Sequence, residues 1–135
     1  MIAPDSSAHR VLIVDDEAAI RRFAARVLLE EGFEVLEAED GVQALTTIAT
    51  GQVNAVVSDI VMPRLNGVQL MEALSISHPH LPVVLMSGYA TGELVGMGIA
   101  APCALIAKPF PPERLIEEVR RCLRGADPLA LGARN

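Results

Sequence analysis

Short runs of branched apolar residues recur five times along this chain, and segments with helical spacing separate them. The runs lie at residues 11–14, 34–37, 55–57, 82–86 and 103–106. Four of the runs lack strict alternation of apolar and polar residues, which is typical of strands covered on both faces. The run at 34–37 has a glutamate at each end, so we expect an edge strand there.

The segments between the runs place apolar residues on one face of a helix. The first segment does so at positions 20, 23, 24, 27 and 28, and a second follows Asp40 and Gln43, which are spaced as a capping pair. A third helix is expected around 70–74. The last helix opens at Pro112, because proline is favoured in the first turn. The segment 91–98 predicts a short fourth helix, since its glycines weaken helical structure.

Strands and helices that alternate five times predict an α/β fold, in which a parallel sheet carries helices on both faces. In doubly wound sheets of this kind, ligands and reactive groups lie at the carboxyl ends of the strands. Side chains that directly follow the apolar runs are therefore the first candidates for a functional site.

Charge and hydropathy exclude several classes of partner. The net charge of −6 argues against nonspecific binding to nucleic acid or to an anionic membrane. The longest apolar stretch, residues 94–107, is too short to span a bilayer, and the start of the chain does not resemble a signal peptide. We therefore expect a cytoplasmic protein with no membrane insertion.

The two cysteines, Cys103 and Cys122, have neither the paired spacing of a zinc site nor that of a disulfide framework. We interpret both as small core residues in a reducing compartment. The 135 residues suit one domain, which we place at 9–124 between a flexible N-terminal segment, 1–8, and a C-terminal tail, 125–135. Because that tail is too short to fold alone, DNA binding is not expected.

Polar side chains follow four of the predicted strands. Asp15 and Asp16 follow the first strand, Asp59 the third and Lys108 the fifth, while Ser87 ends the fourth. Three carboxylates that converge on one point repel one another unless a cation is present. A hard divalent cation such as Mg²⁺ suits such oxygen ligands.

A carboxylate that faces Mg²⁺, a lysine and a hydroxyl is equipped for phosphoryl transfer, because the cations neutralise the charge of the transferring group. An aspartate can itself be the nucleophile and form an acyl phosphate. The sequence contains no GxxxxGK loop and no GxGxxG motif, so nucleotide binding is not indicated.

Four blocks of residues, in order and at matching spacing, resemble the receiver domain of two-component response regulators. The blocks are residues 11–17, 59–63 with Gly67, 86–90 and 108–110, and the resemblance covers about residues 9–124. It implies a flavodoxin-like five-stranded sheet in the order 2-1-3-4-5. The residues around Ser87 are similar to those of receivers attached to hybrid histidine kinases.

The resemblance also implies roles for individual residues. Asp59 would accept a phosphoryl group from a phosphohistidine on a histidine kinase or a histidine phosphotransfer protein. Asp16 and Asp59 would ligate Mg²⁺ directly, together with the backbone carbonyl of Val61, and Asp15 would act through water. The chain would be a signalling domain and not an enzyme, beyond slow self-phosphorylation from small donors and self-dephosphorylation.

The remaining roles concern the switch that follows phosphorylation. Lys108 would pair with the phosphoryl oxygens, aimed by a Lys108-Pro109 bond that is often cis in the family, and Ser87 would hydrogen-bond to one oxygen. Family members usually carry Tyr or Phe three residues before the lysine, where this chain has Leu105. Dimers would form through the face built by the fourth helix, the fifth strand and the last helix.

Three other functions remain open at this stage. A non-phosphorylated interaction module would keep the fold without the chemistry. A Mg²⁺-dependent phosphatase would need a second carboxylate two residues beyond the nucleophile, where this chain has Val61. A flavin-binding module would need aromatic residues to hold the ring, and Tyr89 alone is poor support.

Overall fold

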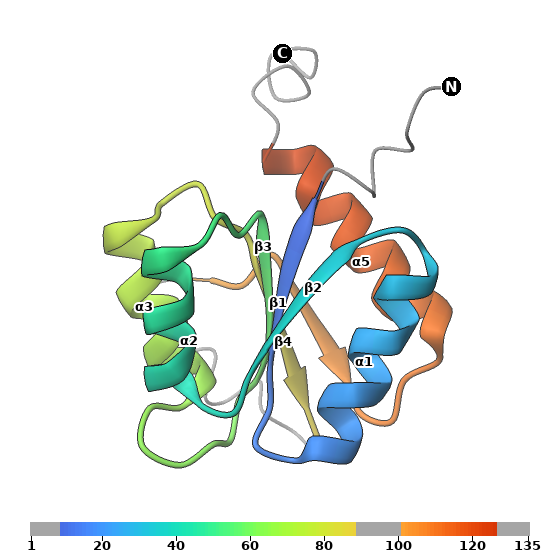
Figure 1. The fold of residues 1–135 in the computed structure, drawn as a ribbon, viewed down its shortest axis with the longest axis horizontal. Coiled ribbons are helices and arrows are strands. Elements are labelled where there is room, and N and C mark those ends of the chain that lie inside the picture. Colours follow the sequence, from blue (N-terminus) through green and yellow to red (C-terminus); the bar gives the residue numbers. More distant parts are fainter. Residues whose placement is uncertain (1–8, 89–100, 127–135) are drawn as a thin grey trace.

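The computed structural model describes residues 9–88 and 101–126. Strands and helices alternate from β1 to β4, as the sequence predicts, and β5 and α5 follow residues 89–100, which lie outside the described residues (Figure 1). In chain order the elements are β1 (Arg10–Val14), α1 (Ala18–Glu30), β2 (Glu34–Ala38), α2 (Gly41–Thr50), β3 (Ala55–Asp59), α3 (Gly67–Ser77), β4 (Val83–Ser87), β5 (Ala104–Ala107) and α5 (Pro112–Ala126).

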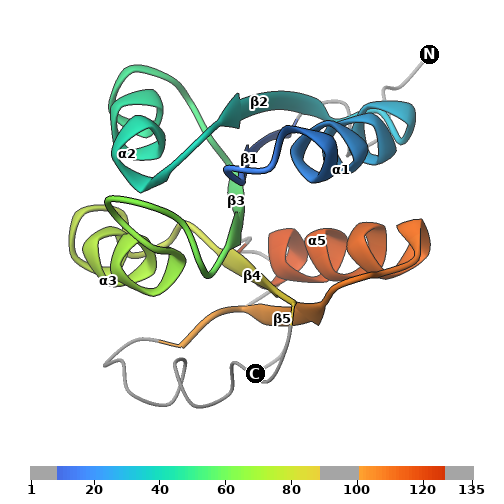
Figure 2. The same cartoon turned by 90° about the horizontal axis from the view of Figure 1, so that it is seen from below.

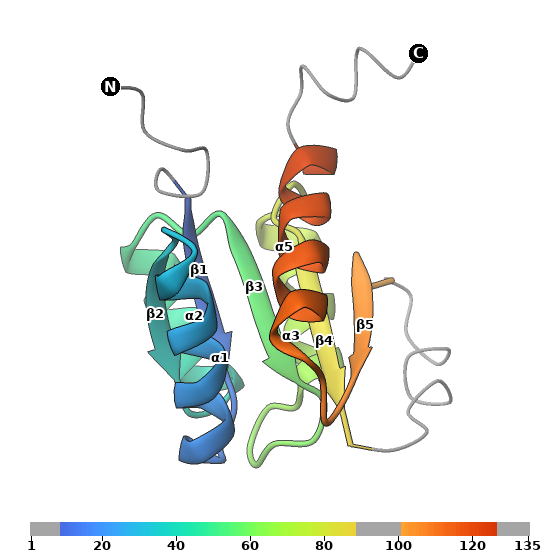
Figure 3. The same ribbon diagram turned by 90° about the vertical axis from the view of Figure 1, so that its right-hand side faces the viewer.

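The strands form one parallel sheet in the order β2-β1-β3-β4-β5. This order confirms the predicted flavodoxin-like topology and places β2 at an edge, as its flanking glutamates indicate. All the strands run in one direction, so their carboxyl ends lie along one side of the molecule (Figure 3). Viewed from that side, α1 and α5 cover one face of the sheet, and α2 and α3 cover the other (Figure 2).

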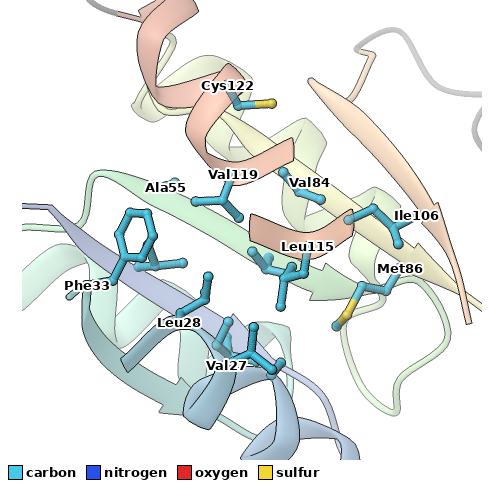
Figure 4. Packing of buried hydrophobic residues seen from close by; sticks show 14 of the residues in the cluster. Val27, Leu28, Phe33, Ala55, Val84, Met86, Ile106, Leu115, Val119 and Cys122 are labelled. Atoms are coloured by element: carbon cyan, nitrogen blue, oxygen red, sulfur yellow. The ribbon is translucent and has the colours of Figure 1, made fainter. Parts of the chain in front are cut away.

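Each face of the sheet has its own apolar core, because successive side chains of a strand point to opposite faces. Along β1, Val11 and Ile13 pack with residues of α1 and α5, and Leu12 and Val14 pack with residues of α2 and α3. The first core contains the rings of Phe33, from the α1–β2 connection, and of Phe110 among mostly aliphatic side chains. Phe33 is labelled in Figure 4. Covering both faces explains why the strands read as continuous apolar runs.

Two helices begin at caps that hold the loops beside the carboxyl ends of the strands. The Asp40 carboxylate accepts the Gln43 N–H at 2.9 Å and so caps α2, which confirms the predicted pair. At α3, the Asn66 side chain accepts the Gln69 N–H and the Gln69 side chain accepts the Asn66 N–H, a reciprocal capping box. The sequence interpretation missed this second cap.

The prediction of two unpaired core cysteines was wrong, because Cys103 and Cys122 form a disulfide. Cys103 lies just before β5, and Cys122 lies on α5, which runs back antiparallel to that strand (Figure 3). The Cα atoms are 6.0 Å apart although 19 residues separate them in sequence. The two cysteines meet because α5 packs back along β5 in the tertiary structure. Their spacing in the sequence therefore could not predict the disulfide.

Some of the expected features lie partly or wholly outside the described residues. The predicted short helix at 91–98, the terminal segment 1–8 and most of the tail lie outside them. α5 itself continues to Ala126, two residues beyond the predicted domain boundary. Within the described ranges, no helix has the length and apolar composition needed to cross a bilayer.

The first residue of α3 packs directly on the end of β3. The Gly67 N–H donates to the Ile60 carbonyl at 2.8 Å. A Cβ added at Gly67 would collide with the Asp59 carbonyl oxygen and would lie 2.9 Å from the Ile60 Cα. Backbone atoms cannot swing aside as a flexible side chain can, so this position requires glycine for a close approach and not for its conformation.

We predict that Gly67→Ala lowers the free energy of unfolding by about 2 kcal/mol, because overpacking displaces the backbone at Asp59. Urea unfolding of both proteins measures the difference. Gly125→Ala is the matched control, since a Cβ there has no heavy atom within 4 Å. The control variant should be as stable as wild type or slightly more stable. Equal stability of the Gly67→Ala variant and wild type would show that the close packing is not a constraint.

Candidate functional site

Three carboxylates meet at the carboxyl ends of β1 and β3, which are neighbouring strands. Asp15 and Asp16 directly follow β1, and Asp59 is the last residue of β3. One carboxylate oxygen from each residue lies within 4.8 Å of the others. Asp15 and Asp59 are buried and Asp16 is exposed. The convergence expected from the parallel sheet is therefore present.

Asp15 is held by hydrogen bonds on every side. Its N–H donates to the Ala38 carbonyl at 3.1 Å, which extends the pairing of β1 with β2. Its Oδ1 accepts the Glu17 N–H at 2.9 Å, and its Oδ2 accepts from Lys108 Nζ at 2.9 Å. The side chain of Asp15 is fully buried, so these hydrogen bonds hold its carboxylate in a fixed position within the acidic cluster.

Lys108 crosses the cluster from the end of β5. Its N–H donates to the Ser87 carbonyl at 2.6 Å, so the sheet places its backbone. Its Nζ lies 2.9 Å from Asp15 Oδ2 and 3.3 Å from Asp59 Oδ1. Burial works against the ammonium charge, but the Asp15 and Asp59 carboxylates outweigh it and raise the pKa of Lys108. The peptide bond between Lys108 and Pro109 is cis, as expected.

The Asp59 carboxyl lies in an environment that disfavours its charge. Burial raises the pKa of this group, and the nearby Asp15 carboxylate adds to the rise. Lys108 acts in the opposite direction without cancelling the effect, so the pKa of Asp59 stays above its ordinary value. A second positive charge near Asp59 would therefore stabilise the ionised form.

Ser87 lies one residue beyond the level of Asp59 in the adjacent strand. The register pairs Asp59 with Met86, and the Ile60 N–H donates to the Met86 carbonyl at 3.0 Å. Ser87 is the last residue of β4 and is buried. The sheet thus brings the predicted hydroxyl to the same edge as the acidic cluster and Lys108.

The loop from β3 to α3 carries Val61, whose side chain is exposed. This loop is tied to the start of α2 because the Gly41 N–H donates to the Leu65 carbonyl at 3.2 Å. Arg64, at a positive φ of 67°, reaches the Asp40 carboxylate with its guanidinium. The Gln43 N–H and Arg64 together hold the pKa of Asp40 below its usual value.

Leu105 lies on β5, at the position where the family usually has an aromatic residue. Its side chain is partly exposed. Tyr89 and the rest of the segment 89–100 lie outside the described residues.

One buried residue near the site was missed by the sequence interpretation. Arg21 on α1 donates to the Asp15 carbonyl and to the Glu37 carboxylate. An arginine followed by another arginine on an amphipathic helix reads as part of a solvated face. The one sequence signal for burial of the Arg21 side chain is its position on α1, next to the apolar stripe.

The donor set of the acidic cluster fits a hard divalent cation. It offers oxygen atoms only, from three carboxylates that can approach one point. Magnesium prefers oxygen ligands and takes few of them from protein, keeping water for the rest. Two of the three carboxylates are buried, so they are held in place before any ion arrives.

Comparison with known proteins assigns the family. The model of the response regulator receiver domain matches residues 11–120, and the chain belongs to this family. Among relatives, the response regulator MprA of Mycobacterium sp. (strain KMS) is 36% identical over 120 residues, which is 88% of this chain and 52% of the relative. The chain thus spans about half the length of that response regulator.

Part of a protein named as a sensor kinase is also similar to this chain. The sensor kinase CckA of Brucella abortus (strain 2308) is 35% identical over 125 residues, which is 90% of this chain and 13% of that protein. Among solved structures, the receiver domain protein (CheY-like) from Methanospirillum hungatei JF-1 has a TM-score of 0.82 at 31% identity, over 87% of this chain and 95% of that one. The receiver domain of NtrX from Brucella abortus has a TM-score of 0.78 at 38% identity, over 84% of this chain and 97% of that one.

We predict that Asp59→Asn raises the free energy of unfolding at pH 7 in metal-free buffer. Between the unfolded pKa, near 3.8, and the higher folded pKa, the folded protein keeps a proton that the unfolded chain has lost. Stability therefore falls as the pH rises through that interval, and the neutral variant escapes this loss.

Urea unfolding at pH 7 and at pH 3 measures the effect. The gain should shrink at pH 3, where the Asp59 carboxyl is protonated in both states. A variant that is less stable than wild type at pH 7 would contradict the prediction.

Proposed function

We propose that this chain is a phosphoacceptor receiver domain in two-component signal transduction, with Asp59 as the acceptor. The observation that carries the proposal is the placement of the single lysine of the chain between the buried carboxylates of Asp15 and Asp59. An acid at the end of a central strand, next to a cation and beside a further acid suited to metal binding, has the equipment for phosphoryl transfer.

In the proposed reaction an Asp59 carboxylate oxygen attacks the phosphorus of a phosphohistidine. An O–P bond forms and the P–N bond breaks, and the imidazole nitrogen leaves with the electron pair and takes up a proton. The attack requires ionised Asp59, and Lys108, 3.3 Å away, favours that form. The chain therefore supplies the nucleophile and a positive charge that prepares it.

Asp16 and Asp59 would hold Mg²⁺ directly with the Val61 carbonyl, and Asp15 would contribute through water. When bound, the ion would neutralise charge on the transferring phosphoryl group. Asp15 fits the indirect role because its two oxygens already accept hydrogen bonds from Glu17 and Lys108. Asp16 is the exposed member of the cluster, which suits a direct ligand.

After transfer, Lys108 would pair with the phosphoryl oxygens and Ser87 would donate a hydrogen bond to one of them. Both groups come from strand ends that flank Asp59 on the side of β4 and β5. Moving Lys108 away from Asp15 would change the β5 end of the sheet. Leu105 cannot present a ring or a hydroxyl to a partner there, so the readout on this face would differ from that of aromatic-bearing receivers.

The partner that we propose is a histidine kinase or a histidine phosphotransfer protein in the cytoplasm. Family membership supports it, as does the similarity to part of a protein named as a sensor kinase. Disulfides are rare in the cytosol, so the Cys103–Cys122 bond would be an exception in the proposed location. A dimer through the face of the predicted fourth helix, β5 and α5 remains part of the proposal. Binding to nucleic acid is not, given the net charge of −6.

Incubation with Mg²⁺ and a small phosphodonor, followed by intact mass measurement, tests the proposal. Wild type should gain the mass of one phosphoryl group only with Mg²⁺ present, and hydroxylamine should remove it, as it does an acyl phosphate. Asp59→Asn should gain none. Ser58→Ala is the matched control, because Ser58 is buried next to Asp59 and its hydroxyl bonds to the Asp59 carbonyl.

Two results would count against the proposal. A wild-type protein that gains no phosphoryl mass would favour the non-phosphorylated interaction module. If the Asp59→Asn variant still gains a phosphoryl group and the Ser58→Ala variant does not, the acceptor would be the Ser58 hydroxyl and not Asp59.

A further inference from the structure

Arg21 is a buried cation that joins the acidic turn after β1 to the edge strand β2. The residue is 8% exposed, although it lies on a surface helix. Its Nη1 donates to the backbone carbonyl of Asp15 at 2.8 Å, and its Nε donates to Glu37 Oε1 at 2.9 Å. The guanidinium fork thus serves a backbone acceptor and a side-chain acceptor at once.

Stability alone is a weak reason for a charge in this position. Taking a guanidinium out of water is costly, and buried ion pairs are often replaced by apolar side chains with no loss of stability. The next residue on the helix, Arg22, is exposed and illustrates the usual placement. What Arg21 provides, and an apolar side chain could not, is a directed hydrogen bond to the Asp15 carbonyl.

That hydrogen bond completes the immobilisation of Asp15. The N–H and both carboxylate oxygens of Asp15 are already engaged by Ala38, Glu17 and Lys108. The Asp15 carbonyl carbon is bonded to the nitrogen of Asp16, so the bond from Arg21 fixes the plane of the peptide that leads into Asp16. Asp16 itself is exposed, and its direction depends on this peptide.

We propose that Arg21 is a positioning residue for the divalent cation site formed by Asp15, Asp16 and Asp59. It acts through the Asp15–Asp16 peptide and does not touch the ion. Glu37 anchors the guanidinium from β2, so the geometry of the site depends on the edge strand as well as on β1 and β3. The inference rests on the proposed function, because it concerns the metal that phosphoryl transfer would use.

The direction in which Mg²⁺ affinity changes when Arg21 is replaced distinguishes a positioning role from a purely electrostatic one. Arg21 is a positive group beside a cation site, so its charge alone would weaken metal binding, and removing it would tighten binding. If Arg21 positions Asp16, removing it must weaken binding despite the lost repulsion. Arg22→Met changes the net charge equally on the same helix and serves as the matched control.

Calorimetric titration with MgCl₂ measures affinity for wild type, Arg21→Met, Arg21→Lys and Arg22→Met, and thermal unfolding in metal-free buffer checks that each is folded. We expect about tenfold weaker Mg²⁺ binding in Arg21→Met, in the range found for groups that orient metal ligands. Arg21→Lys should be weakened less, by about threefold, because an ammonium reaches only one of the two acceptors well. Arg22→Met should bind as wild type does or slightly tighter.

Folded Arg21→Met that binds Mg²⁺ as tightly as wild type, or tighter, would overturn the inference. If Arg21→Met does not fold, Arg21→Lys decides, and wild-type affinity in that variant would overturn it equally. Wild-type protein that binds no Mg²⁺ and gains no phosphoryl mass would refute the proposed function and this inference with it. If wild type binds Mg²⁺ and gains phosphoryl mass while the Arg21 variants bind Mg²⁺ as tightly as wild type, only the positioning role of Arg21 would be refuted.

Discussion

The repulsion among three carboxylates at one edge of the sheet is the constraint on which the site depends. Asp15 and Asp59 are buried there, and their charges are met within the chain by Lys108, 2.9 and 3.3 Å away. One ammonium cannot neutralise three carboxylates. Burial, with the nearby Asp15 carboxylate, raises the pKa of Asp59, and Lys108 offsets this rise only in part. The site is therefore prepared to accept further positive charge, and this preparation links the fold to phosphoryl chemistry.

The surrounding structure keeps this unfavourable cluster in place. The parallel order β2-β1-β3-β4-β5 brings the ends of β1, β3 and β5 to one side, and hydrogen bonds then fix the loops between strands and helices. Gly67 lets α3 begin directly against the backbone of Asp59, and the Asp40–Arg64 pair ties the β3–α3 loop to α2. These contacts offset the electrostatic cost of the cluster through packing elsewhere in the domain.

The fold and the convergence of the site were predictable because both follow from local patterns. Apolar runs give the strands, and their alternation with helices gives a parallel sheet. Asp15 and Lys108 follow strand ends, and Asp59 is the last residue of β3. Arg21 and the Cys103–Cys122 disulfide were not predictable in this way, because each depends on which residues of distant elements meet. The same holds for the close packing of Gly67, which belongs to one of the motif blocks but whose contact with the backbone of Asp59 depends on the tertiary structure.

Thermal unfolding at increasing MgCl₂, with NaCl used to match ionic strength, tests most directly whether the cluster is a cation site. An ion that binds only the folded state raises the unfolding midpoint with its concentration. We expect a rising midpoint for wild type and a much smaller rise for Asp16→Asn, which removes the exposed carboxylate. A midpoint that does not respond to Mg²⁺, or that responds equally in both proteins, would contradict a metal site built on these three aspartates.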